Sequence, residues 1–273
     1  MTFSGNRMDG KVCMVTGATQ GLGAAIARRL AAAGAEAVVV TGRNVKRGKA
    51  VAQSLRDLGA KSHFLPADFG LVEDCRHAVA ETDKLFGRID VLVNAGAMTD
   101  RGTILDTSPD LFDRMFAVNV RGPYFLMQDA IKLMIRDGVQ GAICNIGSIS
   151  ALSGQPFINA YCASKGALTT LTANTAFSVM GNRIRVNQLN VGWMASDNER
   201  ALQEASGGAK WEANAAAKLP FGRLVDPAEA ARAVNFLVSD DAGLMTGAIV
   251  NFDQSVWGAV PGGMPVPDGP MTL

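Results

Sequence analysis

Short apolar runs alternate along the chain with longer stretches in which apolar residues recur at helical spacing. Residues 11–16 are nearly all apolar, and residues 22–33 follow with helical spacing. Continuous apolar runs of this length are typical of parallel strands that helices cover on both faces. The pattern predicts seven strands, at residues 11–16, 37–41, 62–66, 89–94, 142–146, 183–189 and 248–252.

Helix-length stretches fill most intervals between these runs. The connections are short, and short crossovers between parallel strands are right-handed, which builds a doubly wound sheet. We therefore expect the α/β class: a single Rossmann-like doubly wound domain with a seven-stranded parallel sheet and helices on both faces. The predicted helices span residues 22–33, 46–58, 71–86, 109–135, 157–180 and 228–238.

The domain organisation follows from the absence of a linker or an internal repeat. A chain of 273 residues suits one α/β domain, which we assign to residues 1–258. A less hydrophobic segment between Met194 and Leu219 is expected to be a mobile substrate lid. Residues 259–273 form a Pro/Gly-rich tail.

Composition and charge narrow the class of partner. Hydrophobic residues make up 48% and charged residues 19%, which excludes a disordered chain. The 26 basic and 25 acidic residues are scattered and leave a net charge of +1, so we expect no nucleic-acid or membrane-surface partner. The apolar runs are shorter than the roughly 18 residues that a membrane helix requires. A small-molecule partner is expected.

The cysteines and histidines do not predict a metal site. Cys13, Cys75, Cys144 and Cys162 lack metal-ligand spacing, and the only histidines are His63 and His77. Free thiols and a polar segment at residues 1–9 predict a reducing compartment without a secretion signal, and hence a cytoplasmic protein.

A glycine-rich turn directly follows the first strand. It reads Thr16-Gly17-Ala18-Thr19-Gln20-Gly21-Leu22-Gly23 and leads into an apolar helix. Glycines let the backbone approach a pyrophosphate, whose charge meets the N–H groups and positive dipole of the helix N-terminus. An ordinary glycine loop is the alternative, which the position between a strand and a helix disfavours.

A second constellation suits proton transfer. Tyr161 and Lys165 are four residues apart on a predicted helix and share a face. Such a pair alone can be a surface feature, but Ser148 lies 13 residues earlier (161 − 148) at the end of a strand, and Asn119 begins an Asn-Val-Arg-Gly segment.

Together these motifs resemble the short-chain dehydrogenase/reductase family over about residues 10–258. The resemblance implies hydride transfer between a nicotinamide and a carbonyl or alcohol carbon. It makes Tyr161 the general acid/base and lets Lys165 lower the pKa of the phenol and bind the ribose. Ser148 polarises the carbonyl, and Asn119 holds a relay water.

The phenol needs such help because its free pKa is about 10. A unit charge some 5 Å away, at an effective dielectric of about 20, favours phenolate by roughly 3 kcal/mol, or about two pKa units. We therefore expect Lys165 to bring the pKa of Tyr161 into working range.

The resemblance also implies cofactor contacts and shows departures. Asn94 stands in Val-Asn-Ala-Gly, where the family has a second Asn; Val191-Gly192 replaces Pro-Gly, and Asp253-Gln254-Ser255 replaces Asp-Gly-Gly. The expected cofactor contacts are Gly17, Thr19, Gln20, Gly21, Leu22, Gly23, Arg43, Asp68 (with the adenine), Asn94, Tyr161, Lys165 and Val191.

Residues 38–44 favour NADP over NAD. No acidic residue lies between Ala37 and Arg56, whereas NAD enzymes hold the ribose hydroxyl with a carboxylate there. Arg43 offers a fork for a 2′-phosphate, with Lys46 and Arg47 nearby. A solvated basic helix start is the alternative, so NAD stays possible.

The substrate is expected to be a polyol or keto-sugar. The alternatives are reduction of a 3-oxoacyl thioester, for which Arg121 and Arg200 are poor evidence, and a catalytically silent dinucleotide sensor. The long helices from Pro109 and near Phe157 predict a homo-oligomer, tetramer or dimer. Phe112, Phe116 and Tyr124 are expected in the core or a subunit contact, and Ser150, Gln155, Phe157, Trp193, Met194 and Trp257 near the pocket.

Overall fold

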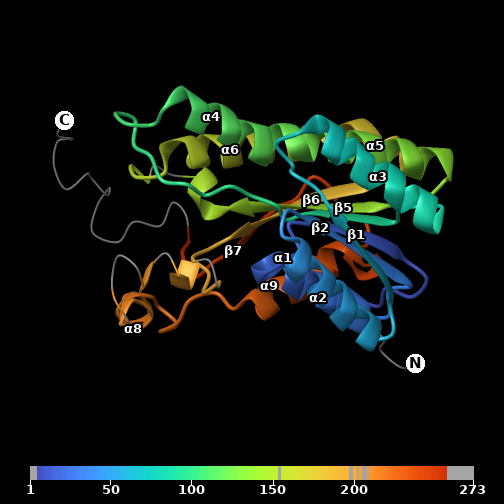
Figure 1. The fold of residues 1–273 in the computed structure, drawn as a ribbon, viewed down its shortest axis with the longest axis horizontal. Coiled ribbons are helices and arrows are strands. Elements are labelled where there is room, and N and C mark those ends of the chain that lie inside the picture. The colour runs from blue at the N-terminus through green and yellow to red at the C-terminus, as the bar shows by residue number, and fades with distance from the viewer. Residues whose placement is uncertain are drawn as a thin grey trace.

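A single seven-stranded parallel sheet runs through the molecule in the computed structural model (Figure 1). The structure describes residues 5–152, 155–196, 199–201, 203–204, 208 and 210–256. The strand order is β3-β2-β1-β4-β5-β6-β7, which confirms the predicted doubly wound sheet. The strands are β1 (Val12–Thr16), β2 (Ala37–Gly42), β3 (Lys61–Pro66), β4 (Val91–Asn94), β5 (Ala142–Ser148), β6 (Arg185–Val191) and β7 (Ile249–Phe252).

Helices cover both faces of this sheet, as the apolar strands require. On one face lie α1 (Gly21–Ala32), α2 (Val45–Asp57) and α9 (Pro227–Val238), and on the other α3 (Val72–Phe86), α4 (Pro109–Phe116), α5 (Gly122–Arg136) and α6 (Asn159–Val179) (Figure 1). The short helix α8 (Trp211–Ala216) lies apart from these layers, beyond the carboxyl end of β6.

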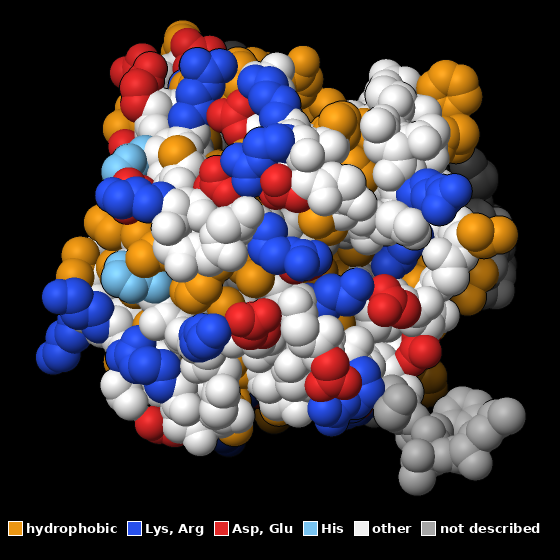
Figure 2. All heavy atoms as spheres, turned by 90° about the vertical axis from the view of Figure 1, so that its right-hand side faces the viewer, with side chains coloured by type: hydrophobic (Ala, Val, Ile, Leu, Met, Phe, Trp, Pro, Cys, Tyr) orange, Lys and Arg blue, Asp and Glu red, His pale blue; other side chains and the backbone are white. Residues whose placement is uncertain are grey.

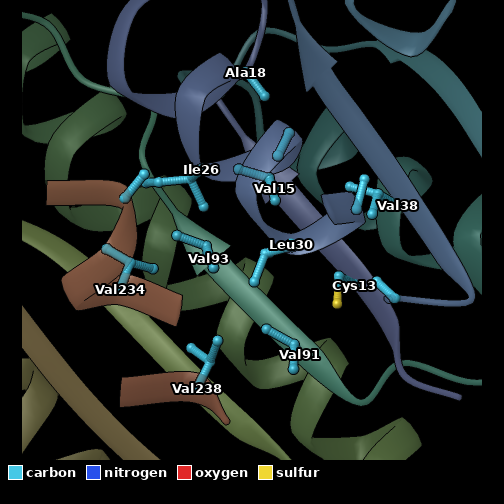
Figure 3. Packing of buried hydrophobic residues seen from close by; sticks show 14 of the residues in the cluster. Cys13, Val15, Ala18, Ile26, Leu30, Val38, Val91, Val93, Val234 and Val238 are labelled. Atoms are coloured by element: carbon cyan, nitrogen blue, oxygen red, sulfur yellow. The ribbon is translucent and has the colours of Figure 1, made fainter. Parts of the chain in front are cut away.

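Two apolar clusters fill the spaces between the sheet and its helices. In the first, Val15 of β1 packs with Leu30 of α1 and Val234 of α9 (Figure 3). In the second, Met14 faces the opposite side with Leu92 and Leu126. Consecutive residues of β1 thus enter different clusters, because successive side chains of a strand point to opposite faces.

The long helix predicted over residues 109–135 is not continuous. A π-helical turn, Ala117–Arg121, separates α4 from α5. Such a turn adds one residue to the helical repeat and frequently marks a functional position. Here it contains Asn119, whose side chain is buried.

The predicted sixth strand was also misplaced, by two residues. Arg183 has a left-handed backbone conformation (φ 59°), which ends the preceding turn, so β6 starts at Arg185 and ends at Val191. This shift brings Val191 into register with Ser148 of β5.

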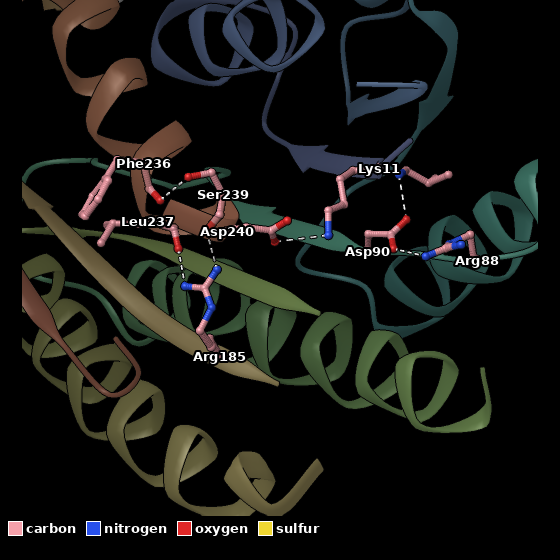
Figure 4. Close-up of polar contacts among 9 residues, drawn as sticks. Lys11, Arg88, Asp90, Arg185, Phe236, Leu237, Ser239 and Asp240 are labelled. Carbon is pink, nitrogen blue, oxygen red and sulfur yellow. Dashed lines mark hydrogen bonds and ion pairs between the residues drawn. The ribbon is translucent and has the colours of Figure 1, made fainter. Parts of the chain in front are cut away.

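Charged side chains tie together the amino ends of the strands, at the opposite edge from the glycine turn. The buried carboxylate of Asp90 accepts a 2.8 Å hydrogen bond from the amide of Val12 and pairs with Arg88 (Figure 4). Arg185 donates to the carbonyl oxygens of Leu237 and Ser239 at the end of α9 (Figure 4). These contacts are structural, since each charge already has a protein partner.

The charge distribution shows no basic stripe on the face drawn in Figure 2. Basic and acidic side chains are interspersed there with apolar and neutral ones. No described helix is long and apolar enough to cross a membrane. Among the described residues, no group of three His, Cys, Asp or Glu side chains is arranged to hold a metal ion.

Candidate active site

The glycine turn lies at the point where the strand order reverses, between β1 and β4. Gly17 has a left-handed backbone (φ 63°), and a Cβ added there would lie 2.4 Å from the Cα of Gly96 after β4. A Cβ on Gly23 would lie 2.4 Å from the carbonyl oxygen of Gly17. Only glycine permits these approaches, so the turn after β1 packs directly against the loop after β4.

The N-terminus of α1 keeps its amide groups available for an anion. Its N-cap, Gln20, makes no side-chain capping bond, and the first turn holds no acidic residue. In contrast, Asn44 caps α2 and Ser108 caps α4 through their side chains. Bare N–H groups and the helix dipole together form the binding site that a pyrophosphate needs.

Two orphaned polar atoms adjoin this turn. Thr41 Oγ1, near the carboxyl end of β2, and Asn94 Oδ1, at the carboxyl end of β4, are buried and have no hydrogen-bond partner among the described residues. Buried polar atoms are normally paired, so unpaired ones at a strand terminus fit a ligand-binding edge. The residues present therefore fit a dinucleotide.

Asn94 itself is held by the neighbouring strand. Its Nδ2 donates to Asn145 Oδ1 on β5 over 2.9 Å. The loop that follows is fixed by Thr16, whose hydroxyl accepts from the amides of Ala95 and Gly96 (3.1 and 3.2 Å). The Val-Asn-Ala-Gly segment, which lacks the second Asn of the family pattern, thus keeps its place beside the glycine turn.

Asp68 is engaged more fully than the sequence predicts. Its Oδ1 accepts from the amide of Gly70 (2.9 Å), and its Oδ2 pairs with Arg114 of α4. Burial raises the pKa of this carboxyl, but the bonds from Gly70 and Arg114 and the charge of Arg43 outweigh burial, so the pKa lies below its usual value. Asp68 is therefore ionised at neutral pH.

Arg43 follows β2 at the surface, near the glycine turn. A Cβ added to Gly42 would lie 2.8 Å from Cγ2 of Thr19, so no carboxylate side chain fits at residue 42 without displacing that threonine. The guanidinium of Arg43 is exposed and makes no hydrogen bond within the described part of the chain. The end of β2 therefore presents a cation rather than an acid.

Tyr161, Ser148 and Lys165 come together at the carboxyl end of β5. Lys165 is 3% exposed, donates a 2.8 Å hydrogen bond to the carbonyl oxygen of Ile146, and lies 5.7 Å from the centre of the Tyr161 ring. Ser148 ends β5, and its hydroxyl adjoins the phenol of Tyr161, whose pKa it lowers. The three residues that the sequence spacing singled out, Ser148, Tyr161 and Lys165, thus lie together in the structure.

The pKa of Tyr161 departs from the sequence-based expectation. Burial raises it to about 12, against a smaller lowering by the hydrogen bond with Ser148 and further raising by Cys162 and Glu199. Burial also lowers the pKa of Lys165 to about 8. The expectation that Lys165 lowers the pKa of the phenol neglected desolvation, which dominates in this structure.

Asn119 connects three parts of the site through its amide. Its Oδ1 accepts from the amide of Met98 (2.8 Å), and its Nδ2 donates to the carbonyl oxygen of Met98 (2.9 Å) and to Ser164 Oγ (3.0 Å). The π turn therefore attaches the loop after β4 to helix α6, which carries Tyr161 and Lys165.

The segment after β6 shows how the departures from the family pattern are accommodated. A Cβ on Gly192 would lie 1.9 Å from Oδ1 of Asp253, so the carboxylate packs on the Gly192 backbone. Gln254 accepts from the amide of Phe221 (2.9 Å) and donates to the carbonyl oxygen of Arg223. The glutamine thus bonds the chain after β7 to the segment after α8.

The expected pocket residues fall into two groups. Ser150 Oγ donates to Gln155 Oε1 over 2.7 Å, and Arg101 lies 5.6 Å above the ring of Phe157. On the other side, Trp193 Nε1 donates to Glu199 Oε1 over 2.8 Å. Met194 forms an isolated bridge with Val225. Trp257 and the tail 259–273 lie outside the described residues.

Sequence reasoning missed three residues near the site. Arg114 binds Asp68 from 46 residues away, Gln254 reaches Phe221 from 33 residues away, and Glu199 accepts from Trp193 within the expected lid. Gln254 stands out as a departure from the family pattern, but no periodicity or motif indicates any of the three contacts, because each depends on tertiary packing.

Comparisons with known proteins identify the family and the fold of the chain. The family model described as enoyl-(acyl carrier protein) reductase matches residues 17–255. An uncharacterized oxidoreductase from Methylorubrum extorquens is 35% identical over 252 residues, 92% of this chain and 99% of the relative.

Two solved structures share the fold. A 3-oxoacyl-(acyl-carrier-protein) reductase from Agrobacterium tumefaciens C58, with NADP bound, has a TM-score of 0.85 at 26% identity over 92% of this chain and 96% of its own. NAD⁺-bound xylitol dehydrogenase has a TM-score of 0.83 at 28% identity over 91% and 99%. With the family match covering most of the sequence, the chain belongs to the short-chain dehydrogenase/reductase family of oxidoreductases.

Proposed function

We propose that the chain is an NADP(H)-dependent enzyme that interconverts a carbonyl and a secondary alcohol. The observation that carries this proposal is the convergence of Tyr161, Ser148 and Lys165 at the carboxyl end of β5, the edge of the parallel sheet that also carries the glycine turn. A bound nicotinamide supplies or accepts the hydride. The glycine turn, the N-terminus of α1, Asn94 and the backbone of Val191 would hold the dinucleotide.

Tyr161 is the general acid in reduction and the general base in oxidation. In the reducing direction, the carbonyl oxygen gains negative charge as the carbon receives hydride, and the phenol O–H supplies the proton. Ser148 donates a hydrogen bond to the same oxygen and stabilises its charge. In the oxidising direction the phenolate removes the alcohol proton.

Lys165 and Asn119 support this pair. The ammonium of Lys165 favours phenolate and is positioned to bind the ribose hydroxyls. Asn119 holds the loop after β4 against α6. We also propose that Asn119 binds a water molecule that links Lys165 to solvent. A silent sensor would have no use for a phenol, a hydroxyl and a buried ammonium at one point.

The preference for NADP rests on the end of β2. The exposed guanidinium of Arg43 is suited to a 2′-phosphate, and Thr19 leaves no room for a carboxylate at residue 42. One similar solved structure contains NADP and another contains NAD⁺, so the preference for NADP is inferred from Arg43 and Thr19 alone.

The proposed substrate is a polyol or keto-sugar. Reduction of a 3-oxoacyl thioester would favour free basic residues at the cleft. Arg200 instead pairs with Glu212, and Arg121 donates to the carbonyl oxygen of Gly70 on the α4–α5 side. Arg101 lies over the ring of Phe157, near the expected pocket. It is the basic residue through which the thioester alternative can be tested.

Turnover tests the proposal directly. Purified protein with NADP⁺ should oxidise one or more of a panel of sugar alcohols, and Tyr161→Phe should lose at least about a thousandfold in kcat while binding cofactor within a few-fold. Tyr124→Phe, at an exposed position of α5, is the matched control and should keep full activity. A tenth of the activity remaining in Tyr161→Phe would refute the proton-transfer role.

The setting of the enzyme follows from two further observations. All four cysteines are free, which suits a cytoplasmic protein. Phe112 and Tyr124 are exposed on α4 and α5, and next to them Phe116 and Arg121 line a hollow of about 540 Å³. We propose that these helices pair in a homo-oligomer, a dimer or tetramer, whose mass light scattering would measure.

A further inference from the structure

The segment after β6 brings a carboxylate to the reacting end of the site. Val191 pairs in register with Ser148, and Trp193 follows two residues later. The indole Nε1 of Trp193 donates to Glu199 Oε1 over 2.8 Å, and Gln203 Nε2 donates to the same oxygen over 2.7 Å. Glu199 is thus anchored from both sides rather than free in solvent.

The anchoring leaves one carboxylate oxygen for a ligand. Both donors bind Oε1, and within the described residues nothing donates to Oε2. The backbone of Glu199 is fixed as well, since its amide donates to Ser196 Oγ over 3.3 Å. Ser196 in turn adjoins the glycine turn, because a Cβ on Gly21 would lie 3.7 Å from its Cβ.

The neighbouring charges do not neutralise Glu199. Arg200 turns to Glu212 and pairs with both of its oxygens, so the next cation along the chain is already satisfied. Trp211, which lies 6.1 Å from the Trp193 ring, is apolar and buried. The charge of Glu199 reaches Tyr161, whose pKa is raised mainly by burial and, to a lesser extent, by this carboxylate.

We propose that Glu199 determines the substrate class: its carboxylate accepts a hydrogen bond from a hydroxyl donor of a neutral substrate and repels substrates that carry a carboxylate or phosphate. The inference rests on the proposed carbonyl–alcohol activity and specifies its substrate. A fixed negative charge repels an anionic substrate, whereas Oε2 accepts a hydrogen bond from a substrate hydroxyl group and so favours its binding.

The first experiment compares pairs of substrates that share a carbon chain but differ in whether one end carries a carboxylate. Sorbitol and gluconate share a six-carbon polyol chain, and methyl acetoacetate and acetoacetate share a 3-oxo group. Wild type should favour the neutral member of each pair that it turns over. Glu199→Gln, which keeps the shape and the acceptor Oε1, should shift the kcat/KM ratio toward the anionic member by about tenfold.

Glu204→Gln is the matched control, because it removes the same charge from an exposed position of the same segment and leaves the pair of Arg200 with Glu212 intact. It should leave both ratios within about twofold of wild type. An unchanged ratio in Glu199→Gln, or an equal shift in Glu204→Gln, would overturn the proposal while leaving the oxidoreductase activity established.

A second experiment needs no turnover. Trp193 is 41% exposed and Trp211 6%, so in a Trp257→Phe background quenching of fluorescence reports mainly on Trp193. Glu199→Gln should raise quenching by iodide about twofold and leave quenching by neutral acrylamide unchanged. If iodide quenching does not rise, the charge does not act on the cleft and the proposal fails. If it rises and no polyol is oxidised, the proposed polyol activity fails and the electrostatic role stands.

Discussion

The ammonium of Lys165 lies 5.7 Å from the centre of the Tyr161 ring and donates its hydrogen bond to the carbonyl oxygen of Ile146. Ile146 belongs to β5, two residues before Ser148. One side chain therefore holds α6 to the strand that carries the second catalytic group. The bond from Lys165 to Ile146 therefore helps to hold the phenol of Tyr161 near Ser148.

This arrangement predicts opposite pH profiles for the two directions. The phenol, with a pKa of about 12, carries its proton at neutral pH, and Lys165 is charged below about pH 8. Reduction should therefore be level below pH 8 and fall above it, as Lys165 loses its charge. Oxidation, which needs phenolate, should rise with pH from neutral values. Steady-state kcat/KM from pH 5 to 10 in both directions measures this, and a reduction rate that rises through pH 8 would contradict it.

Lys165 should also cost stability. Its pKa is lowered from 10.5 to about 8 in the fold, so the unfolded chain binds more protons between these values and stability rises with pH across that window. Below pH 8 the cost is about 3 kcal/mol. Lys165→Met should be inactive yet, after the lost bond to Ile146 is counted, raise the free energy of unfolding at pH 7 by about 1 kcal/mol.

Urea unfolding at pH 7 and pH 10 tests this balance. The gap between Lys165→Met and wild type should shrink at the higher pH, where the wild-type folding cost is smaller. Lys61→Met, which breaks an exposed pair with Glu36, is the control and should change stability by less than about 0.5 kcal/mol at both values. A variant less stable than wild type at pH 7 would show that the ammonium stabilises the fold.

Arg43→Ala should change cofactor preference without harming the catalytic groups. The variant loses the exposed guanidinium after β2, so kcat/KM with NADPH should fall at least about tenfold while that with NADH stays within about twofold. Arg56→Ala, at the far end of α2, is the control, because its guanidinium binds Gln53 and the carbonyl oxygen of Ser62. Higher kcat/KM with NADH in wild type would refute the assignment of Arg43.

The seven strands of the doubly wound sheet and the meeting of Tyr161 with Ser148 could be predicted from the sequence, because the apolar runs indicate the strands and the motif spacing indicates the site. The π turn at Asn119 could not, because one added residue in the helical repeat is too small a change to stand out in the apolar pattern of residues 109–135. The prediction of a lowered pKa for Tyr161 was wrong for a different reason. The distance between Lys165 and Tyr161 follows from their spacing in the sequence, but the burial that raises the pKa depends on the whole fold.

Asp68 shows the same limit at the cofactor side. The resemblance to the family predicts a contact of Asp68 with the dinucleotide, but its partner Arg114 comes from α4, on a separate part of the chain. The segment after β6 is a further case, since Trp193 was expected in the pocket while its partner Glu199 was not. In both places the sequence predicts the group and leaves its partner to tertiary packing.

The side chain of Gln254 should hold the segment after α8 in place. Its side chain spans two backbone groups, the amide of Phe221 and the carbonyl oxygen of Arg223, where the family pattern has glycine. Gln254→Gly removes both bonds, each worth about 1 kcal/mol at most for such an exposed pair. We expect KM for substrate to rise several-fold while kcat changes less than about threefold, since the reacting groups on β5 and α6 are untouched.

Hydrogen exchange separates this role from a general loss of stability. In Gln254→Gly the amide of Phe221 should exchange faster, whereas amides of β5 should keep their wild-type protection. Gln254→Glu is the matched control: its Oε1 still accepts from Phe221 but cannot donate to Arg223, so its KM and exchange should lie between the other two proteins. Unchanged exchange at Phe221 in the glycine variant would show that the segment holds its place without the glutamine, because the bridge between Met194 and Val225 and the apolar contacts of Trp211 with Leu224 would then suffice to order it.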